Sequence, residues 1–384
     1  MPSSPFAPHF KTAVECAINF LTLRSELREG VERLFAHPRY RKDAQIWMTG
    51  SGDSLFAAQS TIPGLRRWAG LKATHLSSIE FARYQAPLLT PADVVWGISN
   101  SGSAARTREA VMLARAKGNL TVGVTGSRTG PLAALADTCV YRPVGELLEI
   151  DAAIRGVFLN MAEYLTTLYA LYFTGLHIGI DNRAIEKAHA EEILSECEAA
   201  ILSIGELAAE YEPAAAEMAA QLKGLDTIWI IGAGPSQGTA RYCAAKFHEQ
   251  LPWNGIPEDL EEWAHLQYFL TLTWKERSVV FVLAPPGNSL DRAEELVEGI
   301  ADAGGRAIAV SHPEHGEFPD AWRSFLARGH ASDYLSPITY HLPAQLLVLH
   351  IARQLGHEPF ALRRQDDYKL IRQGVVLNDL RSLS

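Results

Sequence analysis

The chain has 384 residues, of which 47% are hydrophobic and 21% charged, and its formal net charge is −9. This length allows two globular domains, each able to bury its own core. The acidic balance argues against nucleic acid or an anionic membrane surface as the main partner.

Cysteine usage and hydropathy predict where the chain works. The four cysteines are widely scattered, without a CxxC pair and without a secretory leader before them, which predicts a reducing, cytoplasmic compartment. No apolar run reaches the roughly 18 uninterrupted residues that a membrane span needs. The most apolar stretch, residues 159–180, is interrupted by Glu163 and glycines, so we expect a buried helix there.

Strands and helices alternate in the first part of the chain. Apolar residues at helical spacing predict a helix over residues 12–36. Five short apolar runs follow, at residues 44–49, 73–76, 93–99, 120–125 and 138–141, with helical patterns between the first four. This alternation predicts a parallel sheet with helices on both faces. A nearly continuous run such as VVWGI is typical of a strand covered on both sides.

The third of these strands runs into a turn rich in serine. Ser99, Asn100, Ser101 and Ser103 offer side-chain donors, and Gly102 allows close backbone approach. The helix that follows directs its free N–H groups and positive dipole end at the turn. These features predict an anion cradle, usually for phosphate. An ordinary N-cap turn is the alternative, since serine and asparagine also favour that position.

The pattern of the first half starts again at Asp226. Helical patterns at residues 151–175 and 182–210 come first, and the second is interpreted as a bridge between domains at 1–182 and 183–384. DTIWIIGAGPSQG then repeats the layout of AQIWMTGSGDSLF, and RSVVFVLAPPGNSLDRAEEL repeats that of DVVWGISNSGSAARTREA. We infer an internal repeat of a whole domain. Corresponding positions are Gly50 and Gly232, Gly52 and Gly234, Ser54 and Ser236, and Gly102 and Gly287.

The two copies differ at the turn. The second copy has Ala284, Pro285 and Pro286, which carry no side-chain donors, and proline has no N–H either. Only the first copy is therefore expected to bind an anion well, and the second to serve as scaffold and donor of catalytic groups. GAGPSQG lacks the GxGxxG spacing and a suitably placed acidic residue, which argues against a dinucleotide site.

With the repeat and the SNSG turn, the chain resembles the SIS (sugar isomerase) family. The resemblance is to its two-domain group, which includes the isomerase half of glucosamine-6-phosphate synthase and the fructosamine-6-phosphate deglycases. It covers residues 40–370, and its most specific motifs are GSGDS, SNSGS and KFHEQLPWNGIPEDLEEWAHL. The resemblance implies an α/β fold of two tandem doubly wound parallel-sheet domains of flavodoxin-like type.

The resemblance also assigns roles to residues. The first two motifs would hold a sugar phosphate through Gly52, Ser54 and the turn at Ser99–Ser103. Glu249 would be the base that moves a proton between C1 and C2. His265, sixteen residues later and preceded by Glu262, would assist ring opening. Lys369 is the candidate for the family's tail lysine, which reaches the substrate. This chemistry needs no metal and no cofactor.

One departure concerns the anion. Ala104 stands where the family has Thr or Ser, so Ser103 or Thr107 would have to replace that hydroxyl. Arg106 and Arg108 follow closely, and a guanidinium binds phosphate or sulfonate in a bidentate manner. The identity of the anion therefore stays open. No glutamine amidotransferase segment precedes the repeat, so we do not expect a glutamine-using synthase.

Two functions remain. The first is an enzyme that acts on a hexose or amino-hexose 6-phosphate through an enediol or enamine. It would be either an isomerase or a deaminase or deglycase. The alternative is a regulatory protein that senses a phosphosugar without turnover. Structural alternatives also exist: Glu249 could be a helix-surface carboxylate, and the acidic cluster at residues 258–262 a solvated helix start. The resemblance further implies a homodimer in which His265 serves the neighbouring subunit's site.

Overall fold

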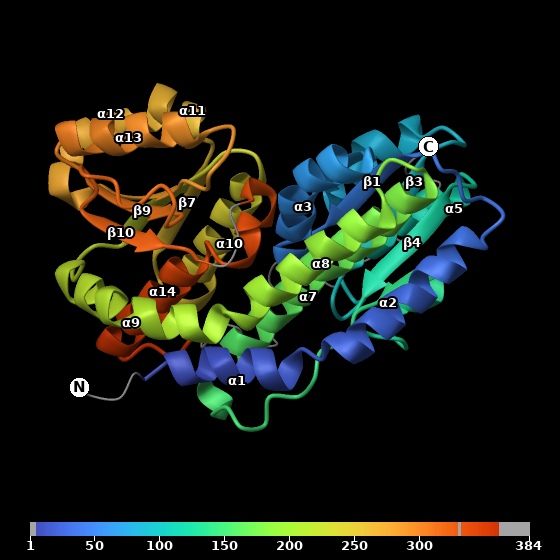
Figure 1. The fold of residues 1–384 in the computed structure, drawn as a ribbon, viewed down its shortest axis with the longest axis horizontal. Coiled ribbons are helices and arrows are strands. Elements are labelled where there is room, and N and C mark those ends of the chain that lie inside the picture. Colours follow the sequence, from blue (N-terminus) through green and yellow to red (C-terminus); the bar gives the residue numbers. More distant parts are fainter. Residues whose placement is uncertain (1–4, 329–331, 361–384) are drawn as a thin grey trace. The chain divides into compact units, whose positions relative to one another are not determined.

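The computed structural model describes residues 5–328 and 332–360, which form two compact units. Among the described residues, unit 1 comprises residues 5–15, 147–159, 196–328 and 332–360, and unit 2 comprises residues 16–146 and 160–195. Each contains one five-stranded parallel sheet (Figure 1). The predicted fold class, two doubly wound α/β repeats, is thus confirmed. The predicted domain boundary between residues 182 and 183 stays a prediction.

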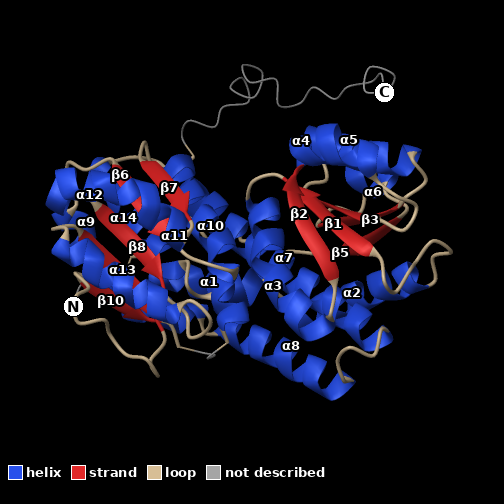
Figure 2. Cartoon of the chain, turned by 90° about the horizontal axis from the view of Figure 1, so that it is seen from above, coloured by secondary structure: helices blue, strands red, loops and turns tan. Residues whose placement is uncertain are grey.

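The sheet of unit 2 has its strands in the order β2-β1-β3-β4-β5, all parallel. β3 and β4 are buried along their whole length, because helices cover both faces (Figure 2). The chain order reverses between β1 and β3, and this topological switch point is where doubly wound sheets bind ligands. The strands are β1 (Gln45–Gly50), β2 (Lys72–Ser77), β3 (Val94–Ile98), β4 (Leu120–Thr125) and β5 (Thr138–Tyr141).

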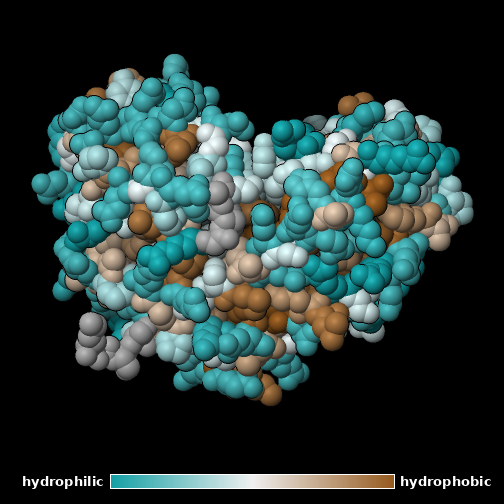
Figure 3. All heavy atoms as spheres, viewed as in Figure 1, coloured by the Kyte–Doolittle hydropathy of each residue, from teal (hydrophilic) through white to brown (hydrophobic). Residues whose placement is uncertain are grey.

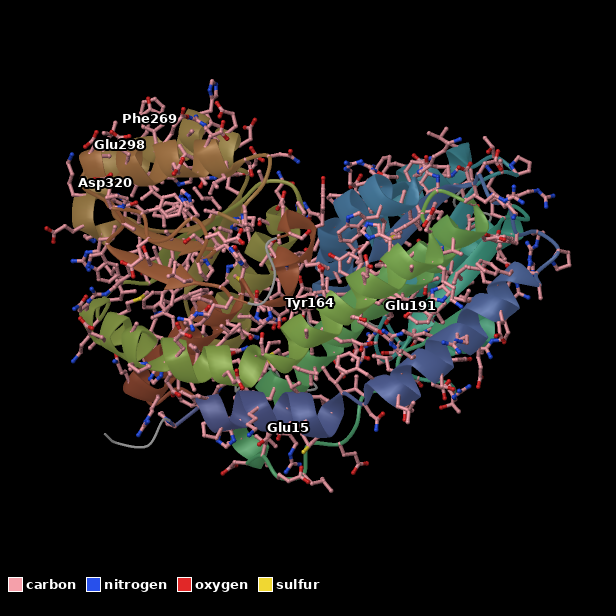
Figure 4. The ribbon with its side chains drawn as sticks, viewed as in Figure 1. Glu15, Tyr164, Glu191, Phe269, Glu298 and Asp320 are labelled. Atoms are coloured by element: carbon pink, nitrogen blue, oxygen red, sulfur yellow. The ribbon has the colours of Figure 1, made fainter. Side chains whose placement is uncertain are left out.

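Helices α3 (Asp53–Ala69) and α7 (Ala152–Asp181) pack closely in unit 2. A Cβ on Gly179 would lie 2.6 Å from Cβ of Ala69, so the glycine allows the helices to touch. On another side, Arg24 of α2 (Phe20–Phe35) forms a 2.7 Å ion pair with Glu191 of α8 (Lys187–Leu202), labelled in Figure 4.

Two predicted helices are each divided. The segment predicted as one helix over residues 12–36 is α1 (Ala7–Ala17) and α2, because the Asn19 side chain caps α2 by accepting a 3.0 Å bond from the Thr22 N–H. The segment predicted over residues 182–210 contains α8 and α9 (Ile204–Gln221), divided at Ser203.

The sheet of unit 1 has the order β10-β9-β8-β6-β7, which is the strand order of unit 2 read from the other side. Its switch point lies between β6 and β8. Trp229, Val280 and Val282 contribute to the core between this sheet and its covering helices. The strands are β6 (Thr227–Ile231), β7 (Asn254–Glu258), β8 (Val279–Leu283), β9 (Arg306–Ser311) and β10 (Arg323–Leu326).

A buried carboxylate on α9 binds the start of α1 in unit 1. Glu212 of α9 is buried and accepts hydrogen bonds of 2.9 Å from the N–H groups of Phe6 and Ala7, at the start of α1. This carboxylate satisfies donors that a helix start leaves open. The other helices are α10 (Pro235–Gln250), α11 (Leu260–Glu262), α12 (Tyr268–Trp274), α13 (Leu290–Asp302) and α14 (Leu342–Leu355).

Local geometry also repeats between the units. Gly52 begins α3 with φ 58° and ψ −137°, and Gly234 begins α10 with φ 55° and ψ −125°. A π-helix follows β2 at Phe81–Gln85, and another follows β7 at Trp263–Gln267. Both pairs are 182 residues apart (234 − 52 and 263 − 81). Such π-turns are rare, so their recurrence supports a duplication.

Hydrophilic side chains cover most of the face drawn in Figure 3, with apolar groups between them. Within residues 5–328 and 332–360, none of the helices combines the length and apolarity that crossing a membrane demands.

Candidate functional site

Two turns meet at the switch point of unit 2. The turn after β1 contains Gly50 and Gly52, and the turn after β3 contains Ser99–Ser103. A Cβ on Gly50 would lie 3.0 Å from the carbonyl oxygen of Ile98, so the two turns approach each other closely. The structure therefore brings together the two motifs predicted to hold the anion.

Both turns lead into helices whose first N–H groups have no side-chain cap. Gly52 is the N-cap of α3, and Ala104 is the N-cap of α5 (Ala105–Ala116). Nothing lies within 4 Å of a Cβ placed on Gly52, so the backbone there faces open space. Two positive helix ends with open N–H groups at neighbouring strand ends favour an anionic ligand.

Hydrogen bonds fix the serine-rich turn in place. The carbonyl of Asn100 accepts 2.9 Å bonds from the Gly126 N–H and the Thr125 hydroxyl, both at the end of β4. Gly102 has φ +70°, and a Cβ on it would lie 3.2 Å from that of Leu132. The left-handed conformation and this close approach both favour glycine. The turn is thus preorganised rather than loosely held.

The hydroxyl groups near the turn divide into two sets. Ser101 and Ser103 are exposed, and their Oγ atoms lie 2.6 Å apart. Thr107, in contrast, is fully buried and shares a 2.9 Å hydrogen bond with Ser78. Thr107 therefore does not supply the hydroxyl that Ala104 lacks, and Ser103 is the hydroxyl that lies at the turn.

Arg106 is already engaged by a carboxylate. Glu109, one turn later in α5, is 1% exposed and forms ion pairs with Arg106 and with Arg83, the latter at 2.7 Å. Two guanidinium groups and one carboxylate leave a net positive charge beside the start of α5. Arg106 was predicted as a direct anion ligand, and the structure places it in this cluster with Glu109. Arg83 and Glu109 were not recognised in the sequence.

The proposed base lies at the end of α10 in unit 1. Glu249 forms a 2.9 Å ion pair with Lys246, whose ammonium group is buried and lies 4.4 Å from the ring centre of Tyr242. Phe247 and Trp253, which lie close to Glu249 in the sequence, stack on each other with ring centres 6.2 Å apart. A buried lysine held by a carboxylate is uncommon, because a buried ammonium needs a partner.

Sequence reasoning missed Lys246. The available signal was its position three residues before Glu249, since residues at this spacing meet on one helix face. The spacing alone gives a surface pair in most helices, and only the packing of α10 shows that this lysine is buried.

The other predicted catalytic residues are less constrained. His265 is exposed in the π-helix Trp263–Gln267. The acidic cluster before it is a helix start, as one reading held: Asp259 caps α11 by accepting from the N–H of Glu261 at 2.8 Å. Lys369 lies outside the described residues. Across residues 5–328 and 332–360, no group of three or more His, Cys, Asp or Glu is arranged to hold a metal.

The corresponding turn of unit 1 has a different environment. A Cβ on Gly287 would lie 2.9 Å from a carboxylate oxygen of Asp333, so this carboxyl group packs directly on the turn. Asp333 is 9% exposed, and burial raises the pKa of its carboxyl to about 6. The turn that lacks donors therefore also carries a buried acid.

The fold and these residues define a pair of doubly wound α/β repeats with an uncapped, serine-rich turn at one switch point. Residues 39–172 match the SIS domain family and are an SIS domain. The chain is homologous to the isomerase domain of the glutamine–fructose-6-phosphate aminotransferases.

Known proteins show the extent of this relationship. The isomerizing glutamine–fructose-6-phosphate aminotransferase of Thermococcus kodakarensis is 25% identical over 283 residues, 73% of this chain and 44% of that protein. The C-terminal domain of the Francisella tularensis enzyme superposes with a TM-score of 0.71 at 17% identity, covering 88% of this chain and 97% of that domain. The chain spans about half the length of the curated relatives it matches.

One further relative is of another kind. An uncharacterized HTH-type transcriptional regulator of Haemophilus influenzae is 33% identical over 144 residues, which is 36% of this chain and 47% of that protein.

Proposed function

We propose that the chain is an enzyme that isomerises, deaminates or deglycates a hexose or amino-hexose 6-phosphate, or a closely similar anionic sugar. The turns of unit 2 bind the anion through Gly52, Ser54 and Ser99–Ser103. Proton transfer is assigned to Glu249, His265 and Lys369. Homology to an isomerase domain supports the reaction class, and the open helix starts of α3 and α5 support the ligand class.

The observation that carries catalysis is the pair of Lys246 and Glu249. An enediol forms when a base removes a proton from the carbon beside a carbonyl, and a nearby cation stabilises the oxyanion that develops. Glu249 is partly exposed, with 22% of its side chain accessible, whereas Lys246 is buried behind it. The carboxylate can therefore reach a ligand while the ammonium group holds its position.

The test is Glu249→Gln, which removes the base and keeps the side-chain shape. We expect at least a 1000-fold loss of kcat for fructose 6-phosphate or glucosamine 6-phosphate, on the order of the contribution of a positioned base. Binding of the same sugars, measured by calorimetry, should change little. Exchange of the C2 proton in deuterated water follows the chemical step directly. Undiminished exchange in the variant would refute the assignment.

We extend the proposal to a homodimer in which His265 serves the neighbouring subunit. Apolar side chains next to His265 are exposed: Leu266 at 60% and Phe269 at 56%, the latter on the outside of α12 (Figure 4). Such a surface is typical of an interface. If sites are shared, mixing the inactive variants Glu249→Gln and His265→Ala should restore part of the activity, and each variant alone should not.

The regulatory alternative rests on the Haemophilus relative, whose matched segment covers about half of that protein. A sensor would bind phosphosugars without C2 proton exchange. Binding by the unaltered chain without exchange, for any hexose or hexosamine 6-phosphate, would favour this second function.

A further inference from the structure

A buried arginine lies at the same edge of the unit 2 sheet as the serine-rich turn. Arg142 follows β5 directly, and its N–H donates a 3.0 Å hydrogen bond to the carbonyl of Thr125. β5 is the neighbour of β4, which ends at Thr125 and is followed by Gly126. These two residues also hold Asn100 in the turn. The main chain of Arg142 is therefore linked to the serine-rich turn by two successive hydrogen bonds through Thr125.

The charge of Arg142 is poorly compensated within the described residues. Its side chain is 1% exposed, and its one hydrogen bond to a side chain is a long 3.4 Å contact from Nη1 to the hydroxyl of Thr166. The Nε donor is buried without a hydrogen-bond partner, and within residues 5–328 and 332–360 Arg142 forms no ion pair. Glu163 on α7 acts on it only at longer range.

The buried charge of Arg142 lowers the stability of the folded protein, so its presence calls for an explanation. A guanidinium stays protonated at neutral pH even where burial lowers its pKa, here to about 10. A buried charge without a partner destabilises a protein, and an apolar residue of similar size often serves stability better. Unit 1 has an apolar residue at the corresponding position. Ala327 follows β10 and donates to the carbonyl of Ser311, so it occupies the position that corresponds to Arg142.

We propose that Arg142 is a positioning and specificity-determining residue of the anion site, whose buried positive charge favours a doubly charged phosphate in the turn at Ser99–Ser103. The inference rests on the proposed function, because it assigns the anion to that turn. The ligand compensates a charge that the protein buries without a carboxylate. Anion binding and folding stability are therefore coupled through Arg142.

The charges around the turn agree with this assignment. The Arg83, Arg106 and Glu109 cluster carries one net positive charge, and α3 and α5 present their positive ends. The Arg83 and Arg106 side chains are each 27% exposed, so water and salt weaken their fields. Arg142 is buried, so its field is screened less and persists at physiological salt.

The test compares Arg142→Met with Arg39→Gln. Arg39 is the matched control, because it loses the same charge from the same unit while its partner is Asp137, at 2.6 Å. Titration with inorganic phosphate and with fructose 6-phosphate should show about tenfold weaker binding in Arg142→Met, and less than twofold change in the control. The unliganded Arg142→Met protein should be as stable as the original, or more stable. A merely structural arginine would give the opposite result, lower stability with unchanged affinity.

A second variant covers misfolding. Arg142→Lys keeps the charge, and we expect phosphate affinity within about threefold of the original. Equal affinity in the original chain, Arg142→Lys and Arg142→Met would overturn the inference while leaving the proposed function intact. If Ser99→Ala with Ser101→Ala leaves phosphate binding unchanged, the anion is not in this turn, and both proposals fail.

Discussion

The turns after β3 and β8 occupy corresponding places in the two repeats but differ in their chemistry. In unit 2 the turn carries exposed serines, and Arg142 lies at the same sheet edge. In unit 1 the turn carries alanine and prolines, Ala327 replaces the arginine, and Asp333 packs against Gly287. The contrast teaches that one strand order can carry two different chemical environments at its switch point, and under our proposal only the environment of unit 2 binds an anion.

Helix α5 and helix α13 show the same contrast at one residue. Glu109 and Glu294 each stand at the fifth position of their helix. Glu109 is buried between two arginines, whereas the Glu294 side chain is 48% exposed and pairs with His315 at 2.9 Å. One glutamate thus organises a charged cluster, and the other belongs to the surface.

The largest effect is expected from Glu109→Gln. Removing a buried carboxylate leaves the two guanidinium groups without their shared partner, which should destabilise unit 2 by roughly 2–4 kcal/mol. The corresponding Glu294→Gln, at an exposed pair, should cost about 0.5 kcal/mol or less. Urea denaturation of both variants measures the difference. Equal losses would show that burial at this position does not separate the repeats.

A smaller effect is expected from Asp333→Asn, and it depends on pH. The folded-state pKa of about 6 lies above the ordinary value of 3.8, so the folded protein holds this proton more tightly than the unfolded chain. Protonated Asp333 therefore makes its full contribution to stability below pH 3.8, and this contribution is lost as pH rises through 6. At pH 7.5 the free energy of unfolding is about 2–3 kcal/mol lower than it would be with the proton bound.

Asparagine cannot ionise, so Asp333→Asn should remove this decline. The variant should be more stable than the original at pH 7.5 by about 1 kcal/mol or more, and closer to it at pH 5. Urea titrations at both pH values decide the matter, and a parallel pH dependence in the two proteins would show that Asp333 titrates normally.

The smallest effect is expected from grafting the serine-rich turn onto unit 1 with Ala284→Ser, Pro285→Asn and Pro286→Ser. The graft supplies donors but leaves Asp333 beside the turn and Ala327 after β10. Calorimetry should still give one inorganic phosphate bound per chain. A second phosphate would show that the turn alone creates an anion site and that the buried charges are secondary.

The sequence predicts most of this architecture. Local patterns predict the strand positions, the duplication and the correspondence of Gly52 with Gly234. In a parallel α/β repeat, turn residues and glycines are required at the same places in each copy. The start of α2 after Asn19 could also have been predicted from this capping residue, but the apolar periodicity continues across it and concealed the break.

The missed features all depend on tertiary packing. Residues distant in sequence, or the covering of a whole helix face, determine three of them. These are the burial of Lys246, the burial of Arg142 without an ion pair, and the two arginine partners of Glu109. Each of these residues is an ordinary charged residue in the sequence. Charged side chains are rarely buried, so sequence reasoning assigns them to the surface by default.

The recurring π-helices bear on the history of the two halves. Arg83 in one copy and His265 in the other stand at the third position of these matching five-residue π-helices. In one repeat this position belongs to the charged cluster of Arg83, Arg106 and Glu109, and in the other it holds an exposed histidine. The same irregular helix thus presents a structural ion pair in one half and an exposed imidazole in the other.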